Sequence, residues 1–449
     1  MISGKELIFK VFNNETVERV PWIPYTGIHV ASLSELNSEI FLQNEDLLFE
    51  NLMKAHKQYS PDGMPVVFDL QIEAEILGCG LMWAEKAPPS VSIHPLENST
   101  ELNLKLPNKS EGRLPLVINV MEKLKRKVGD TTALYGLACG PLTLASHLRG
   151  MNLFMDMYEN PEFVQKIIDF STEVFLRISG FYIEAGMDVI ASVDPIVSQI
   201  SPETFVQFLD KPYKKIFGSL REMGIKNGFF VCGDATKNLE VMCNTGPDSI
   251  SIDENIDIFK AKKITDKYDI VISGNIPLTT VMLLGTQQDN QKYAIDLIEK
   301  LGKKNFILAP GCDMPYDIPP ENIVGIAQAV NDPEAIKLFI KDYQKIEIDL
   351  IVQMPDYENL KKPLIEVFTI DSATCAACGY MTLAAMEMKD EFGDEIEVIE
   401  YKITERENVV RVTNLGLKNL PTLLINGVPK FISIIPNRKE LIDEIKKYL

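Results

Sequence analysis

The sequence predicts an α/β protein in which a (β/α)8 TIM barrel is followed by a smaller α/β domain. Two observations support this prediction. Eight apolar or β-branched runs alternate with amphipathic stretches in the first part of the chain, and a polar segment from Met354 to Pro363 separates them from a second, compact pattern. The expected domains are residues 1–349 and 364–449, joined by a linker at residues 350–363.

The barrel prediction depends on the number of strands. The runs expected to form strands are Trp22–Tyr25, Pro65–Asp69, Ala133–Cys139, Asp188–Asp194, Phe229–Asp234, Ser249–Asp253, Ile270–Ser273 and Phe306–Pro310. Helices are expected at Pro161–Ala185, Ser201–Met223, Thr236–Thr245, Gln287–Leu301 and from Pro320 to about Asp349. Eight strand–helix units close most simply into a barrel.

The second pattern also alternates between strands and helices. In chain order we expect a strand at Leu364–Ile370, a helix from Cys375 to about Phe392, a strand at Glu395–Thr404, a short helix, a hairpin from Leu420 to Ile434 and a last helix at Arg438–Leu449.

The composition limits the partners and the location. The chain carries a net charge of −19, which repels nucleic acid and anionic lipid, so neither is expected to bind. No apolar run approaches the roughly 20 residues that cross a bilayer, and the charged start is unlike a signal peptide. The seven cysteines are scattered and odd in number, which favours a reducing cytoplasm over a disulfide framework.

Two cysteines stand at predicted strand ends, where parallel α/β folds bind substrates and metals. Cys232 lies near the end of the fifth run, and Cys312 follows the eighth. Together they suggest a soft-metal or sulfur site, and the alternative is a pair of small buried apolar residues. Cys139, which ends the third run, could join them, whereas Cys79 and Cys243 are expected to be structural.

The second domain contains Cys375-Ala-Ala-Cys378 at the expected start of a helix. The helix dipole stabilises the first thiolate there, and the second thiol can resolve a mixed disulfide. With Leu420-Pro421-Thr422 opposite, the domain resembles thioredoxin. The resemblance implies a cis bond before Pro421, with Cys375 as the attacking thiol and Cys378 as the resolving thiol; the alternative is a structural or metal-binding pair.

The first domain resembles the uroporphyrinogen decarboxylase superfamily. The matching segments are Gly140–Arg149, Ile183–Ile190, Ser201–Phe205 and Pro319–Asn322. The superfamily has the (β/α)8 fold and contains porphyrinogen decarboxylases and cobalamin-dependent methyltransferases.

Two segments separate these branches. The decarboxylases have arginines near the N-terminus for a substrate with many carboxylates, and Trp22–His29 has none. Asp69 matches the decarboxylases' catalytic aspartate by its spacing to Gly78. Phe68–Glu75 nevertheless reads more like the methyltransferase branch, and there Glu73 and Glu75 are expected to contact the cofactor.

The methyltransferase resemblance implies zinc held by His-X-Cys and a distant cysteine, which would activate a thiol. Cys232 and Cys312 match the cysteines, but Phe230 replaces the histidine. His29 is the expected substitute ligand, with other strand-end groups as alternatives: Asp194, Asp234, Glu73 and Glu75. Asp194 is also expected to orient the substrate or a protonated cofactor group, or else to cap a helix or turn, and Asp234 fits a cap equally well.

These observations predict a corrinoid-dependent methyltransferase. It would use a corrinoid protein or free cobalamin and a small, thiol-type acceptor at the barrel mouth, and the appended dithiol would reduce a Cys232–Cys312 disulfide or handle a sulfur-containing substrate. One alternative is a thiol-redox or sulfur-transfer protein whose barrel only binds a ligand. A weaker alternative is a decarboxylase that acts on a small substrate through Asp69.

Overall fold

The computed structural model describes residues 2–344, 352–370, 372, 376–417 and 419–449. These residues form two compact units. The larger unit lies within residues 2–344, and the smaller unit contains the described residues from 352 onward.

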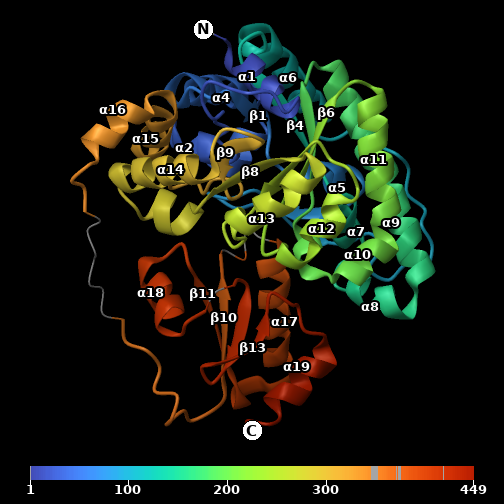
Figure 1. Ribbon diagram of the computed structural model, residues 1–449. Helices are drawn as coiled ribbons and strands as arrows, with labels where there is room; N and C mark the ends of the chain where they lie inside the picture. The colour runs from blue at the N-terminus through green and yellow to red at the C-terminus, as the bar shows by residue number, and fades with distance from the viewer. Residues whose placement is uncertain (1, 345–351, 371, 373–375, 418) are drawn as a thin grey trace. The chain divides into compact units, whose positions relative to one another are not determined.

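A curled sheet of seven parallel strands forms the centre of the larger unit (Figure 1). In sheet order the strands are β1 (Gly63–Pro65), β4 (Ala133–Cys139), β5 (Val189–Val193), β6 (Lys226–Val231), β7 (Ser249–Ile252), β8 (Val271–Ile276) and β9 (Phe306–Pro310). Every residue of these seven strands is buried except Lys226, the first residue of β6. Such burial is expected for strands that helices cover on the outer face.

The segment around Trp22 closes this sheet. The Ile23 N–H donates to the Leu308 carbonyl at 3.0 Å, and on the other side the Asp62 N–H donates to the Trp22 carbonyl at 3.0 Å. The segment therefore lies between β9 and the start of β1, which is the eighth position of a TIM-barrel-like fold. Trp22 is 1% exposed in this position.

Helices surround the sheet (Figure 1). They are α1 (Gly4–Phe12), α2 (His29–Ser32), α3 (Ser38–Leu42), α4 (Glu45–Tyr59), α5 (Ile72–Ile76), α6 (Leu114–Val128), α7 (Pro141–Arg149), α8 (Asn152–Glu159), α9 (Pro161–Glu184), α10 (Pro202–Phe208), α11 (Asp210–Glu222), α12 (Leu239–Cys243), α13 (Ile258–Thr265), α14 (Gln287–Leu301), α15 (Pro320–Asn331) and α16 (Pro333–Phe339). None of the described helices of the chain is both long and apolar enough to cross a membrane.

The last predicted barrel helix is divided in the structure. α15 ends at Asn331, and the Asp332 side chain then accepts a hydrogen bond from the Ala335 N–H, which starts α16 with Pro333 in its first turn. The prediction of one continuous helix from Pro320 is therefore wrong, and residues 345–349 of the predicted helix lie outside the described residues.

Other differences are smaller. The predicted strand Pro65–Asp69 begins earlier, as β1, and ends at Pro65. The predicted helix Ser201–Met223 consists of α10 and α11, which meet at Leu209. An antiparallel hairpin of β2 (Gly80–Met82) and β3 (Ser90–Ile93) was not predicted, because its short strands are at most half-buried and lack a clear alternation.

The smaller unit is a four-stranded mixed sheet with helices. Its strands are β10 (Leu364–Thr369), β11 (Glu397–Lys402), β12 (Thr422–Ile425) and β13 (Val428–Ile432), in the order β11-β10-β12-β13. Its helices are α17 (Ala376–Phe392), α18 (Arg406–Asn414) and α19 (Arg438–Ile445). β10 and β11 are parallel, and the other neighbours are antiparallel.

Candidate active site

Two cysteines from distant parts of the barrel meet where their strands end. Cys232 follows β6 and Cys312 follows β9 after Gly311. Their sulfur atoms form a disulfide bond, and their Cα atoms lie 5.9 Å apart. Both side chains are partly buried against the apolar core of the barrel. The structure thus brings together the pair that the sequence pattern singled out.

Aromatic rings fill the barrel interior next to this disulfide. Phe230 is 1% exposed, and its ring centroid lies 4.7 Å from that of Tyr25 and 5.4 Å from that of Phe68. The Tyr25 hydroxyl is hydrogen-bonded to the hydroxyls of Ser251 and Ser273, each at 2.9 Å. Phe230 therefore packs as core in the position where the family resemblance implies a histidine ligand.

His29 does not join the cysteines. Its Nε2 lies 2.8 Å from the Tyr59 hydroxyl, and its Nδ1 lies 3.2 Å from the Tyr316 carbonyl oxygen. Burial lowers the pKa of His29 to about 4, so the ring is neutral at physiological pH. With both ring nitrogens engaged, His29 is placed as a structural residue. The described part of the chain holds no group of three or more His, Cys, Asp or Glu side chains arranged to bind a metal ion.

Arg113 holds two of the predicted site carboxylates. Its Nη1 lies 2.5 Å from Asp69 Oδ2, and its Nε lies 2.7 Å from Glu75 Oε2. The guanidinium carbon lies 5.1 Å from the ring centroid of Trp83. Arg113 precedes α6 in a stretch without a strand-end or motif signal, which is why the sequence did not point to it.

Glu73, one of the predicted cofactor contacts, is almost completely buried. It is 1% exposed on α5, its Oε1 accepts a hydrogen bond from the Cys139 N–H at 3.0 Å, and its Oε2 has no hydrogen-bond partner. Burial is the main cause that raises the pKa of Glu73 to about 7, and the charge of Asp69 adds to it. Glu73 therefore exchanges a proton near neutral pH.

We expect Glu73→Gln to raise the free energy of unfolding near pH 8 by up to about 3 kcal/mol. Near pH 4 the same substitution should change it little. Because the folded-state pKa lies above that of the unfolded chain, the wild type loses stability as the pH rises from about 4.5 to about 7. Glutamine does not titrate and avoids this loss. Urea unfolding across this pH range measures the difference, with the exposed Glu240→Gln as control. A gain of equal size at both ends of the range would contradict the prediction.

Asp194 is saturated by hydrogen bonds at the end of β5. Its Oδ1 accepts from the Thr143 N–H at 2.8 Å and the Thr143 hydroxyl at 2.6 Å, and its Oδ2 accepts from the Leu142 N–H at 3.0 Å and the Tyr213 hydroxyl at 2.6 Å. The side chain is fully buried. Of the two roles that the sequence left open, these contacts support capping of the first turn of α7.

Further carboxyl groups follow the ends of β6, β7 and β9. Asp234 accepts hydrogen bonds from the Thr236 N–H and hydroxyl and so closes a turn. Asp253 and Glu254 follow β7, and burial together with Asp253 raises the pKa of Glu254. Burial also raises the pKa of Asp313 well above its usual range. Only Asp234 was singled out from the sequence, although strand-end position also signals the other three.

The remaining barrel cysteines are free, buried thiols. Cys139 is 0% exposed at the end of β4, and burial raises its pKa well above the usual range. Burial raises the pKa of both Cys79 and Cys243 to about 12. All three are therefore protonated at neutral pH. Cys139, which the sequence offered as a third member of the site, is not bonded to the Cys232–Cys312 pair.

The smaller unit carries the predicted dithiol motif. Cys378 lies in the first turn of α17 and is 0% exposed. Cys375 lies outside the described residues. The peptide bond between Leu420 and Pro421 is cis, as the thioredoxin resemblance implied.

The barrel can now be compared with known proteins. Residues 3–333 match the family described as uroporphyrinogen decarboxylase (URO-D), which is most of the chain. The chain therefore belongs to the uroporphyrinogen decarboxylase family.

Relatives of this chain include both methyltransferases and decarboxylases. A methylcobamide:CoM methyltransferase, MtbA of Methanosarcina acetivorans, is 27% identical over 72% of this chain and 95% of its own length. A uroporphyrinogen decarboxylase of a Wolbachia species is 28% identical over 64% of this chain and 82% of its own. A solved methyltransferase from Methanosarcina mazei covers 74% of this chain and 99% of its own, with a TM-score of 0.68 and 23% identity, which supports the fold. The expected enzyme class agrees with that of the methyltransferase relatives.

Proposed function

We propose that this protein transfers a methyl group between a corrinoid and a small thiol at the mouth of its barrel. The observation that carries the proposal is the meeting of Cys232 and Cys312 at two strand ends. Relatives named as methylcobamide:CoM methyltransferases, which align over nearly their whole length, support it. The corrinoid, free or carried by a partner protein, would supply or accept the methyl group on its cobalt.

Buried polar atoms near the mouth suit a corrinoid, whose rim carries carboxamide groups. Glu73 Oε2 and Arg113 Nη2 are both buried and have no hydrogen-bond partner. The arginine can donate to an amide oxygen, and the glutamate can accept from an amide nitrogen. Asp69 and Glu75 fix the arginine in place, so both acids would position the cofactor through it.

Zinc does not fit the described residues in this state. The two cysteine sulfurs are bonded to each other, Phe230 offers no ligand atom, and both nitrogens of His29 are engaged. A structural or catalytic zinc site needs at least three protein ligands. The proposal therefore contains no step through zinc.

The appended unit extends the proposal to thiol redox chemistry. We propose that it acts as a thioredoxin-like reductant of the barrel disulfide. The Cys375 thiolate would attack the Cys232–Cys312 bond, and one barrel sulfur would leave as a thiolate and take up a proton. Cys378 would then displace the second barrel sulfur, so that two electrons leave the small unit and its own disulfide forms. The Cys-X-X-Cys sequence at a helix start supports this role.

The disulfide also supports a second candidate function, in which the barrel binds a thiol partner and exchanges disulfides without transferring methyl groups. The decarboxylase alternative has less support, because Asp69 is held by Arg113 and its second oxygen accepts from the Gln71 N–H.

Methylcobalamin mixed with a panel of thiols, under strongly reducing conditions, tests the proposal. We expect cobalt(I) to appear in the absorbance spectrum with at least one thiol, and Cys232→Ala to lower the rate, because the reduced Cys232 thiol lies at the strand end where the substrate thiol is proposed to bind. Cys243→Ala removes a buried thiol away from the strand ends and should retain the rate. Absence of methyl transfer to every thiol would overturn the proposal and favour disulfide exchange.

A further inference from the structure

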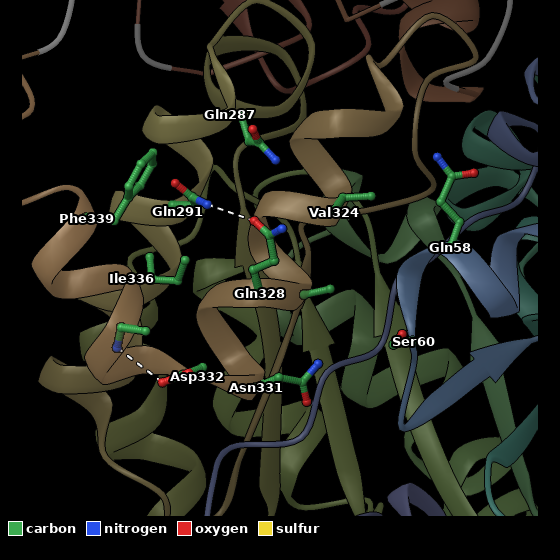
Figure 2. Close-up of a pocket in the computed structure, with 12 residues that line it drawn as sticks. Gln58, Ser60, Gln287, Gln291, Val324, Gln328, Asn331, Asp332, Ile336 and Phe339 are labelled. Carbon is green, nitrogen blue, oxygen red and sulfur yellow. Dashed lines mark hydrogen bonds between the residues drawn. The ribbon is translucent and has the colours of Figure 1, made fainter.

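We propose that the cleft between α4, α14, α15 and α16 binds an uncharged, planar molecule with an amide-like hydrogen-bonding edge. The cleft has a volume of about 640 Å³ and is formed by outer helices of the larger unit (Figure 2). This volume lies in the range of small-molecule sites. None of its lining residues belongs to the strand-end site, so this ligand would act apart from methyl transfer.

Carboxamide side chains dominate the polar lining of the cleft. Gln287 and Gln291 come from α14, Gln328 and Asn331 from α15, and Gln58 from the end of α4 (Figure 2). A carboxamide presents an acceptor oxygen and a donor nitrogen in one plane. The matching ligand therefore offers donors and acceptors in its own plane, as an amide, a lactam or a nucleobase does.

Gln291 supplies a hydrogen-bond acceptor of this lining that has no partner. It is 3% exposed, its Nε2 donates to Gln328 Oε1 at 3.0 Å, and its Oε1 is buried without a hydrogen-bond partner. A buried acceptor is unfavourable until a donor reaches it. Gly325 makes the arrangement feasible, because a Cβ at this position would lie 2.7 Å from Gln287 Cγ and 3.3 Å from Gln291 Cγ.

The charge and the apolar residues of the cleft indicate the charge and the apolar part of the ligand. Asp332 is the charged residue of the lining, and it is already used to cap α16. No lysine, arginine or histidine is among the described lining residues, so a negatively charged ligand would find no counter-ion. Val324, Ile336 and Phe339 provide apolar surface, and Phe339 is 67% exposed. A flat ring could cover Phe339 while its polar edge meets the amides.

Nicotinamide and nicotinate, which differ only in an amide and a carboxylate, test this site on the full chain. By calorimetric titration we expect nicotinamide to bind saturably with a Kd on the order of 1 mM, and nicotinate at least about tenfold more weakly. Gln291→Met keeps the length of the side chain and should weaken nicotinamide about tenfold. Gln288→Met changes a neighbour on α14 outside the lining and should leave the affinity unchanged.

Val324→Trp provides a second variant in case Gln291→Met does not fold, because it fills the cleft from a half-buried position. It should abolish nicotinamide binding. The proposal is overturned if nicotinamide shows no saturable binding, if nicotinate binds equally well, or if the variants in the lining bind as the wild type does.

Discussion

Replacement of Cys375 by serine is expected to leave the fully reduced enzyme active and to slow its reactivation after oxidation at least about tenfold. Serine cannot form the mixed disulfide that the proposed reduction of Cys232–Cys312 requires. The buried Cys378 would not substitute for it, because a buried thiol attacks poorly. The loss therefore concerns recovery of activity rather than methyl transfer itself.

The measurement starts from enzyme oxidised with diamide and freed of oxidant. A limiting amount of dithiothreitol is added, and methyl transfer and free barrel thiols are followed together. Cys79→Ser removes a buried thiol with a raised pKa and should recover at the wild-type rate. If Cys375→Ser recovers as fast as the wild type, the small unit does not serve as the reductant of the barrel, while the methyltransferase proposal stands.

Arg113→Leu is expected to destabilise the larger unit by about 3–5 kcal/mol. The substitution leaves the carboxylate of Asp69, whose side chain is fully buried, without its ion-pair partner. It also removes the contact with Trp83 and the pair with Glu75. An uncompensated buried charge costs far more than the loss of an exposed pair.

Urea unfolding followed by tryptophan fluorescence measures this effect in the right unit, since both tryptophans, Trp22 and Trp83, lie in the barrel. Lys214→Met breaks the exposed pair with Asp210 and should cost no more than about 1 kcal/mol. If both variants unfold at the same urea concentration, Arg113 does not hold the carboxylates as its geometry indicates.

Parts of the fold were predictable where local chemistry and tertiary packing agree. The helix Gln287–Leu301 has the predicted bounds, because Thr286 caps its start and Gly302, at φ +72°, ends it. The run at Trp22–Tyr25 lies beside β9 at the edge of the sheet, but the predicted strand is reduced to one bridge between Trp22 and Leu308. The division at Asp332 was missed because an apolar period continues across it, while the cap depends on one side chain.

The sequence predicted where the candidate site lies better than it predicted which side chains contact one another there. The strand-end rule placed Cys232 and Cys312 together, because parallel strands end at one edge. It misdirected the interpretation of His29, since the chain turns into α2 there and the ring faces Tyr59. Arg113 depends on contacts between segments far apart in the chain, which no local pattern encodes.

The bond between Cys232 and Cys312 also has a mechanical consequence for the barrel. It joins points 80 residues apart, and the loop that it closes contains β7, β8 and β9. In the chain-entropy view, a loop of this length reduces the freedom of the unfolded chain by about 4.5 kcal/mol at 25 °C. The oxidised barrel should thus withstand heat and proteolysis better than the reduced one. Oxidation would therefore leave the enzyme in a stable, inactive form that a dithiol can reduce back to the active form.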